Sequence, residues 1–159
     1  MTITIVCVGK IKERYLRDGI AEYAKRLSRY CRVQFREVAD ERTPDRAPEA
    51  LADEIRRTEG ARILNAIPAR AHVIALAIDG DAPDSVVFSE SIEKLALRGE
   101  SHIAFVIGGS LGLSAEVLAR SDERISFSAM TFPHQLMRMI LLEQIYRAFR
   151  IMRKEPYHK

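Results

Sequence analysis

The sequence contains no tryptophan, only two cysteines and no long uninterrupted apolar run. Two isolated cysteines, Cys7 and Cys31, cannot build a disulfide framework, and their positions suit reduced thiols. The most apolar stretch, residues 136–152, is interrupted by charged side chains and lacks the roughly 18 to 20 apolar residues of a membrane span. No positively charged region precedes the apolar residues 2–8, which argues against a signal peptide. We therefore expect a cytoplasmic protein that makes no membrane contact.

The histidines and cysteines are also too few and too scattered for a metal site. They form no cluster at the spacing of metal ligands, so we expect no bound metal. Length sets a further limit, because 159 residues with 47% hydrophobic content can bury one core but not two. Residues 1–159 are therefore predicted to form a single domain.

The net charge of +3 is too small to indicate a partner, but the basic residues are grouped. One group lies within residues 10–14, a second within 25–32, and a third extends from residue 138 to residue 159. The first two are explained as well by solvated helix faces as by contact with nucleic acid. The third is interleaved with Tyr146, Tyr157 and His158, whose rings can stack on bases, and it favours RNA binding.

Hydrophobic periodicity predicts alternating strands and helices. The expected strands are residues 2–8, 33–38, 72–79, 102–109 and 124–130. The expected helices are residues 16–30, 47–66, 89–97, 114–120 and 133–152. Strands that alternate with helices predict an α/β fold, with a largely parallel, twisted sheet covered on both faces. Ligands in such sheets bind beyond the carboxyl ends of the strands, which directs attention to the ends of the strands at residues 79, 109 and 130.

A glycine-rich segment, VIGGSLGLS, follows the fourth expected strand. Gly108, Gly109 and Gly112 lack Cβ atoms, so a ligand could lie directly on the backbone there. Taken alone, a Gly-Gly pair is better explained as a tight turn. No Gly-Lys-Ser/Thr follows, which excludes a P-loop, and the dinucleotide-binding fingerprint belongs after a first strand rather than a fourth.

Longer motifs carry a resemblance to a known family. These are VIGGSLGLS and SFSAMTFPHQLMRMILLEQIYRAFRI followed by EPYHK, together with GKIKERYLRDGIAEYAKRLSRY and LAIDG. The chain resembles the ribosomal RNA large subunit methyltransferase H family along its whole length. The resemblance implies a SPOUT fold with a C-terminal trefoil knot, S-adenosylmethionine as cofactor, and a homodimer that completes each site. It also implies N3-methylation of a pseudouridine in 23S rRNA within assembled ribosomes.

The same resemblance implies the site residues. Those expected to bind the cofactor are Leu76, Gly108, Phe127, Ser128, Ala129, Met130, Thr131 and Phe132. Those expected to serve catalysis are Glu143, Arg147, Tyr157, His158 and Lys159. Without the resemblance, each apolar residue is explained by the core, Glu143 and Arg147 by an i, i+4 ion pair, and the tail by a frayed terminus. His158, Arg147 and Lys159 are the candidates to assist loss of the N3 proton, and whether any protein group accepts it is left open.

The last expected helix bears apolar residues on two sides. One side holds Met137, Ile140, Leu141, Ile145, Ala148 and Met152, and the other holds Met139, Leu142, Tyr146 and Phe149. We expect one side to meet the sheet and the other a second subunit. His134 is expected to cap or pack. The alternative function is a non-catalytic ribosome-binding module with a vestigial site, which the preserved glycines disfavour.

Overall fold

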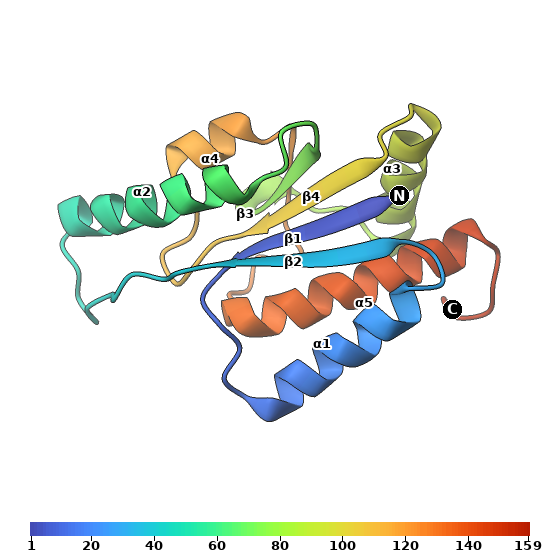
Figure 1. The fold of residues 1–159 in the computed structure, drawn as a ribbon, viewed down its shortest axis with the longest axis horizontal. Coiled ribbons are helices and arrows are strands. Elements are labelled where there is room, and N and C mark those ends of the chain that lie inside the picture. Colours follow the sequence, from blue (N-terminus) through green and yellow to red (C-terminus); the bar gives the residue numbers. More distant parts are fainter.

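The computed structural model describes residues 1–159 as a five-stranded sheet with helices on both faces (Figure 1). The strands are β1 (Thr2–Val8), β2 (Arg32–Val38), β3 (His72–Asp81), β4 (His102–Ile107) and β5 (Glu123–Ile125). The helices are α1 (Arg14–Leu27), α2 (Glu49–Ala66), α3 (Ser85–Leu97), α4 (Ala115–Arg120) and α5 (His134–Met152). The strand order is β2-β1-β4-β3-β5 and every neighbouring pair is parallel, which confirms the predicted α/β class.

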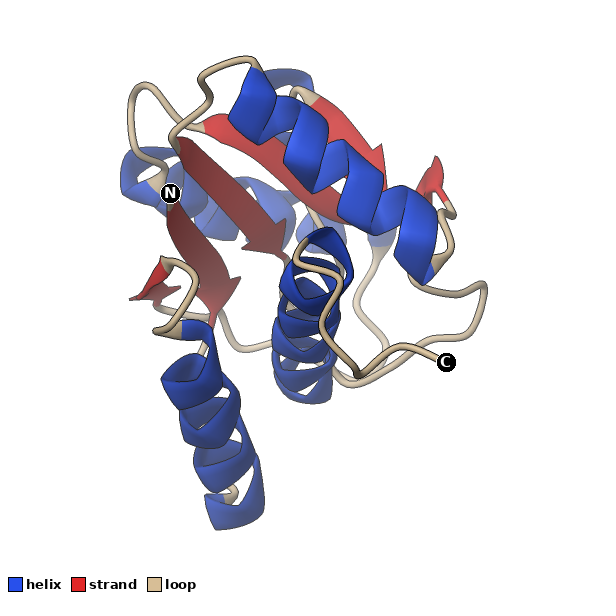
Figure 2. Cartoon of the chain, turned by 90° about the vertical axis from the view of Figure 1, so that its right-hand side faces the viewer, coloured by secondary structure: helices blue, strands red, loops and turns tan.

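The central strands supply two separate cores. Ile3, Ile5 and Cys7 of β1 pack with residues of α1, α3 and α5, whereas Val6 and Val8 pack with residues of α2 and α4. Alternate side chains of a strand point to opposite faces, so a strand buried on both faces must be apolar throughout. Figure 1 shows α1 and α5 below the sheet and α2 and α4 above it, and Figure 2 shows the same layering from the side. None of the helices has the length and apolar character needed to cross a membrane.

The predicted last strand, residues 124–130, is wrong beyond its start. Ladder pairing stops at Ile125, and residues 126–133 form an irregular loop. In this loop, serine side chains bond to backbone groups that a neighbouring strand would otherwise pair. The Ser126 hydroxyl donates to the Ser128 carbonyl at 3.0 Å, and Ser128 Oγ accepts the Met130 N–H at 2.9 Å. Local side-chain bonds of this kind compete with a strand ladder.

Two helix boundaries also differ from the predicted ones. Helix α3 begins at Ser85 rather than residue 89, because the Asp84 carboxylate caps it by accepting the Val87 N–H at 2.8 Å. Helix α1 ends at Leu27, so Tyr30 lies in the turn that follows.

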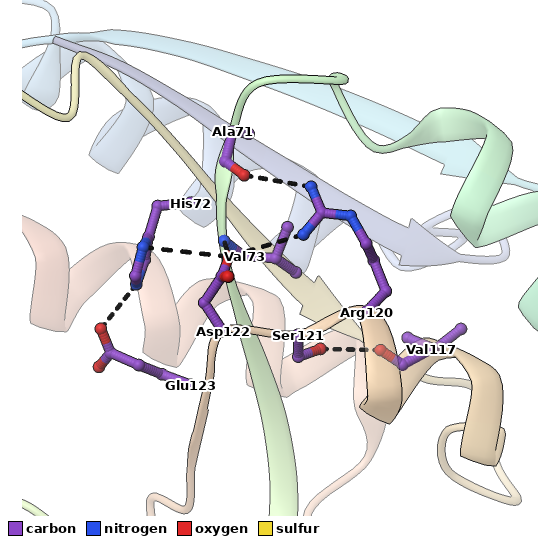
Figure 3. A network of polar contacts seen from close by, with 8 residues as sticks. All are labelled: Ala71, His72, Val73, Val117, Arg120, Ser121, Asp122 and Glu123. Carbon is purple, nitrogen blue, oxygen red and sulfur yellow. Dashed lines mark hydrogen bonds and ion pairs between the residues drawn. The ribbon is translucent and has the colours of Figure 1, made fainter.

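A polar network fixes the short strand β5 to β3 (Figure 3). Asp122 accepts the Val73 N–H on its carboxylate at 2.7 Å and donates its own N–H to the Val73 carbonyl at 2.8 Å. Arg120 lies 3.5 Å from the same carboxylate, and His72 Nε2 lies 2.6 Å from Glu123 Oε1. These contacts set the register of β5, and so fix where the loop that follows it begins.

Helix α1 covers one of the two apolar sides of α5 that were expected to meet different partners. Tyr30 stacks on Phe149 at 5.5 Å, and the ring centroids of Tyr23 and Tyr146 are 6.4 Å apart. Met139 lies so close to Gly19 that a Cβ there would be 2.3 Å from its sulfur. The same chain therefore covers this side, so a second subunit would have to meet another face of α5, and the homodimer stays a prediction.

A third, outward stripe of α5 remains half-buried between α1 and α3. Its members recur every three or four residues and so share one helix face. They are Leu136, Ile140, Glu143, Arg147 and Ile151.

Candidate active site

A cavity of about 620 Å³ opens at the carboxyl ends of β3, β4 and β5. Its walls come from the end of β3, the glycine-rich segment after β4, the loop 126–133 and the first turn of α5. The lining residues are Leu76, Ala77, Ile78, Ile107, Gly109, Ser110, Gly112, Ile125, Ser126, Phe127, Ser128, Met130, Thr131, Phe132, Pro133, His134, Gln135 and Met137. This is the edge where parallel α/β sheets bind their ligands.

Most of the residues expected to bind a cofactor lie on this wall. Those that line it are Leu76, Phe127, Ser128, Met130, Thr131 and Phe132. Gly108 and Ala129 are not part of the lining. Ala77 and Ile78 also line the cavity but were not predicted from the sequence. They lie where the pairing of β3 with β5 is interrupted, between Leu76 and Asp81.

The glycine-rich segment forms a tight turn, and Gly108 and Gly112 are each needed there for a different reason. The Gly109 carbonyl accepts the Gly112 N–H at 3.1 Å, and Gly112 has φ +83°, where a Cβ would point into open space. A Cβ on Gly108 would instead lie 2.7 Å from the carbonyl carbon of Gly112. Gly108 therefore has a reason within the chain, because its missing side chain lets the turn close on itself; its expected contact with the cofactor stays a prediction.

Glu59 of α2 stands directly behind this turn and was missed by sequence reasoning. The residue is 4% exposed, and its carboxylate oxygens lie 2.9 and 3.2 Å from the position of a Cβ on Gly109. It accepts the Glu41 N–H at 3.0 Å, and burial raises its pKa. A glutamate on an amphipathic helix is normally solvated, so the sequence carries no signal of this burial.

His134 begins α5 and forms part of the cavity wall. The cap position is Pro133, so His134 does not cap the helix, and its ring is half-buried against the loop after β1. Burial, followed by the nearby Arg138 charge, lowers the pKa of His134, which keeps the imidazole neutral at neutral pH.

Four of the five expected catalytic residues meet at the other end of α5, and we call them the C-terminal cluster: Glu143, Arg147, Tyr157 and His158. Glu143 Oε1 accepts from Arg147 Nη2 at 2.6 Å and from the Tyr157 hydroxyl at 3.0 Å. Arg147 Nη1 lies 3.4 Å from His158 Nδ1, and its guanidinium lies 4.6 Å from the Tyr157 ring centroid. Lys159 is exposed and has no polar partner within the chain.

The tail is folded back on α5 rather than frayed. Arg150 forms an ion pair with Glu155 and donates to the Pro156 carbonyl at 2.8 Å, while the Tyr30 hydroxyl donates to Glu155 at 2.6 Å. Tyr157 packs edge-on against Tyr146 at 5.0 Å. Burial, and next the bond to Glu143, raise the pKa of Tyr157 to about 12, so its phenol stays protonated at neutral pH.

The cavity and the C-terminal cluster do not meet within one chain. His134 and Arg147 stand thirteen residues apart on a single helix. At 1.5 Å of rise per residue, this separates them by about 20 Å along the axis. The structure thus divides the expected site into two parts at opposite ends of α5.

Comparisons with known proteins identify the family of the chain. A family model described as predicted SPOUT methyltransferase matches residues 1–158. A Listeria monocytogenes protein named ribosomal RNA large subunit methyltransferase H is 59% identical over 159 residues, and a Bacillus cytotoxicus protein of the same name is 58% identical, each covering all of both chains.

Solved structures show the same fold at low identity. A probable methylase family protein from Haemophilus influenzae Rd KW20 is 16% identical with a TM-score of 0.53, over 99% of this chain and 70% of that one. TrmJ from Z. mobilis ZM4 is 13% identical with a TM-score of 0.53, over 100% and 73%. With full-length relatives near 58% identity and a matching family model, the chain belongs to the ribosomal RNA large subunit methyltransferase H family of SPOUT methyltransferases.

Proposed function

We propose that the chain, as one domain, transfers a methyl group from S-adenosylmethionine to N3 of a pseudouridine in 23S rRNA. The substrate is the assembled ribosome, which places the enzyme in the cytoplasm. The observation that carries the proposal is the open cavity at the carboxyl edge of the sheet, in a chain that belongs to this family. A vestigial site would have filled this space with side chains.

The cavity suits S-adenosylmethionine in size and chemistry. Its volume of about 620 Å³ lies within the range of ~300 to 1,000 Å³ that is typical of small-molecule sites. Leu76, Met130 and Phe132 would provide apolar walls, and the backbone of the turn at Gly112 would approach the ligand without a side chain between them. The cofactor supplies an electrophilic methyl group on a sulfonium, so the chain must orient the acceptor base and make it electron-rich.

The C-terminal cluster fits that second task. N3 of pseudouridine is a weakly acidic imide nitrogen, and a fixed cation beside it stabilises the anion. Arg147 is held by two hydrogen bonds to Glu143, which raise its pKa, so it stays charged and cannot take the proton. This leaves His158 and Lys159 as the groups able to accept it.

A homodimer would bring the two halves of the site together. The outward stripe of α5 combines apolar residues with Glu143 and Arg147, as an interface that also holds a site requires. A twofold axis across this stripe would set two α5 helices antiparallel, so that the C-terminal cluster of each subunit lies beside the cavity of the other. The separation of about 20 Å within one chain supports this arrangement.

Two assays test the proposal. Labelled methyl transfer should be strong with intact ribosomes and weak with protein-free rRNA or tRNA, and it should vanish on ribosomes with uridine in place of the target pseudouridine. Equal transfer to uridine-containing ribosomes would overturn the assignment of the target.

The composite site is tested by mixing two inactive variants. Gly108→Val forces apart the turn whose Gly109 and Gly112 wall the cavity, and deletion of residues 157–159 removes the tail. After subunit exchange at equal amounts, half of the dimers are mixed and each has one complete site, so about a quarter of wild-type activity should return. A mixture that stays inactive while mixed dimers form would show that each site comes from one chain.

A further inference from the structure

The segment between β1 and α1 lies at the same edge of the sheet as the cavity. β1 ends at Val8, and Gly9, with φ +79°, turns the chain while its N–H donates to the Val38 carbonyl at 2.8 Å. His134 of the cavity wall lies against this turn, with its Nε2 3.9 Å from the position of a Cβ on Gly9. Residues 10–15 therefore leave the sheet from a point next to His134 and the first turn of α5.

This segment is held in place from inside the molecule. Ile11 packs against the core, and Leu16 is buried at the start of α1. Arg138, whose side chain is 3% exposed, donates to the Gly9 carbonyl at 3.1 Å and pairs with Glu37 at 2.7 Å. The anchored backbone presents its remaining side chains outward in a fixed arrangement.

The outward side chains are mainly cationic, with the ring of Tyr15 beside them and one carboxylate, Glu13, among them. Lys10, Lys12 and Arg14 are exposed, and Tyr15 is 70% exposed, so its ring is accessible from solvent. Their sole ion pair, between Arg14 and Asp18 at 3.6 Å, joins two highly exposed side chains and holds Arg14 only weakly. Cations beside an exposed ring match nucleic acid, which offers phosphates to the cations and base faces to the ring.

We infer that Lys10, Lys12, Arg14 and Tyr15 form a basic rim that grips rRNA next to the nucleotide in the site, a role that rests on the proposed function. The three cations contact phosphates, and Tyr15 stacks on an unpaired base beside the target. The rim takes no part in cofactor binding, because none of its four residues lines the cavity.

The test removes the three charges together in the variant Lys10→Ala, Lys12→Ala, Arg14→Ala. The KM for ribosomes should rise about tenfold or more near 0.1 M salt, with kcat at saturating ribosomes and affinity for S-adenosylmethionine unchanged. The slope of log affinity against log salt should fall by roughly 0.7 to 0.9 per lost phosphate contact.

A matched control removes the same charge elsewhere. Arg70, Lys94 and Arg98 are exposed and lie near the start of β3 or of β4, at the opposite edge of the sheet. Their triple alanine variant should keep the wild-type KM. An equal rise in KM for both triple variants would show that net charge alone matters, which overturns the rim. An unchanged KM in the Lys10, Lys12 and Arg14 variant would overturn it too.

Single changes at Tyr15 separate stacking from charge. Tyr15→Ala should raise the KM several-fold, whereas Tyr15→Phe, which keeps the ring, should not. Equal effects of both variants would overturn the stacking role. If the wild-type enzyme methylated no ribosomes, the proposed function would fail, and co-sedimentation of the same variants with ribosomes would still decide whether the rim binds RNA.

Discussion

The hydroxyl of Tyr157 donates a hydrogen bond of 3.0 Å to Glu143 Oε1, the same oxygen that accepts from Arg147 Nη2 at 2.6 Å. One carboxylate oxygen thereby fixes both a phenol from the tail and a guanidinium from α5. Because these donors occupy Glu143, we expect this residue to position them rather than to act as a base. The three side chains should respond to substitution as one unit.

Arg147→Lys should lower kcat at least tenfold while affinity for S-adenosylmethionine stays at the wild-type value. A lysine keeps the charge but cannot donate twice to Glu143 and at the same time present a flat donor face to the base. Single-turnover methylation of ribosomes and calorimetric titration with the cofactor measure the two quantities. A variant with normal single-turnover rate would show that the guanidinium geometry is unimportant.

Deletion of residues 157–159 should abolish methylation with cofactor affinity retained. It should also lower Tm by a few degrees, because Tyr157 packs on Tyr146 and bonds to Glu143. Lys159→Ala is the matched change without a structural cost, since Lys159 is exposed and unpaired within the chain. Wild-type kcat per folded molecule in the truncated enzyme would refute a catalytic role for the tail.

The two glycines of the turn should behave differently. Gly108→Ala places a Cβ against the Gly112 backbone, so it should destabilise the fold by about 1 to 3 kcal/mol and weaken cofactor binding as the turn shifts. In Gly112→Ala the new Cβ contacts no atom, and only the positive φ of this position destabilises the fold, by about 1 kcal/mol. Urea unfolding ranks the two variants, and a larger loss at Gly112 would contradict the geometry.

Glu59→Gln should stabilise the protein near neutral pH. Burial raises the pKa of Glu59, so the folded state favours the protonated carboxyl. Its stabilising contribution is present below the ordinary glutamate pKa of about 4.3 and is lost as pH rises through the raised folded value. The amide of the variant can still accept the Glu41 N–H without carrying a charge.

Denaturation of this variant and the wild type at two pH values checks the sign. The variant should have the larger free energy of unfolding near pH 7.5, and the difference should fade near pH 4. A variant that is less stable near pH 7.5 would mean that the negative charge itself supports the glycine turn.

Periodicity was sufficient to predict the sheet, because β1 and β4 are buried on both faces and carry apolar residues throughout. It failed at residues 126–130, where alternating small and apolar residues imitate a strand although their hydroxyls bond to the local backbone. It also could not assign the second apolar side of α5, because a helix pattern does not reveal whether α1 or another subunit covers it. The trefoil knot implied by the family resemblance stays a prediction.

The family resemblance supplied the expected residues of both halves of the site, which stay predictions, but not the groups that support them. Glu59 and Arg138 are charged residues on helices, a pattern normally typical of solvated faces, and only the folded chain brings one behind Gly109 and the other onto Gly9. Long-range contacts of this kind leave no periodic mark in a sequence.

The order of the strands also sets when the enzyme can first work during its own synthesis. β1 is made first, yet it pairs with β4, so that Thr2 stands beside His102, and Arg138 must reach back to the carbonyl of Gly9. Such distant pairing delays closure of the sheet until most of the chain exists. The cavity further requires β5 and the start of α5, so a growing chain has no methyl-transfer site. An enzyme of this design becomes active only once the ribosome that made it has nearly finished translating it.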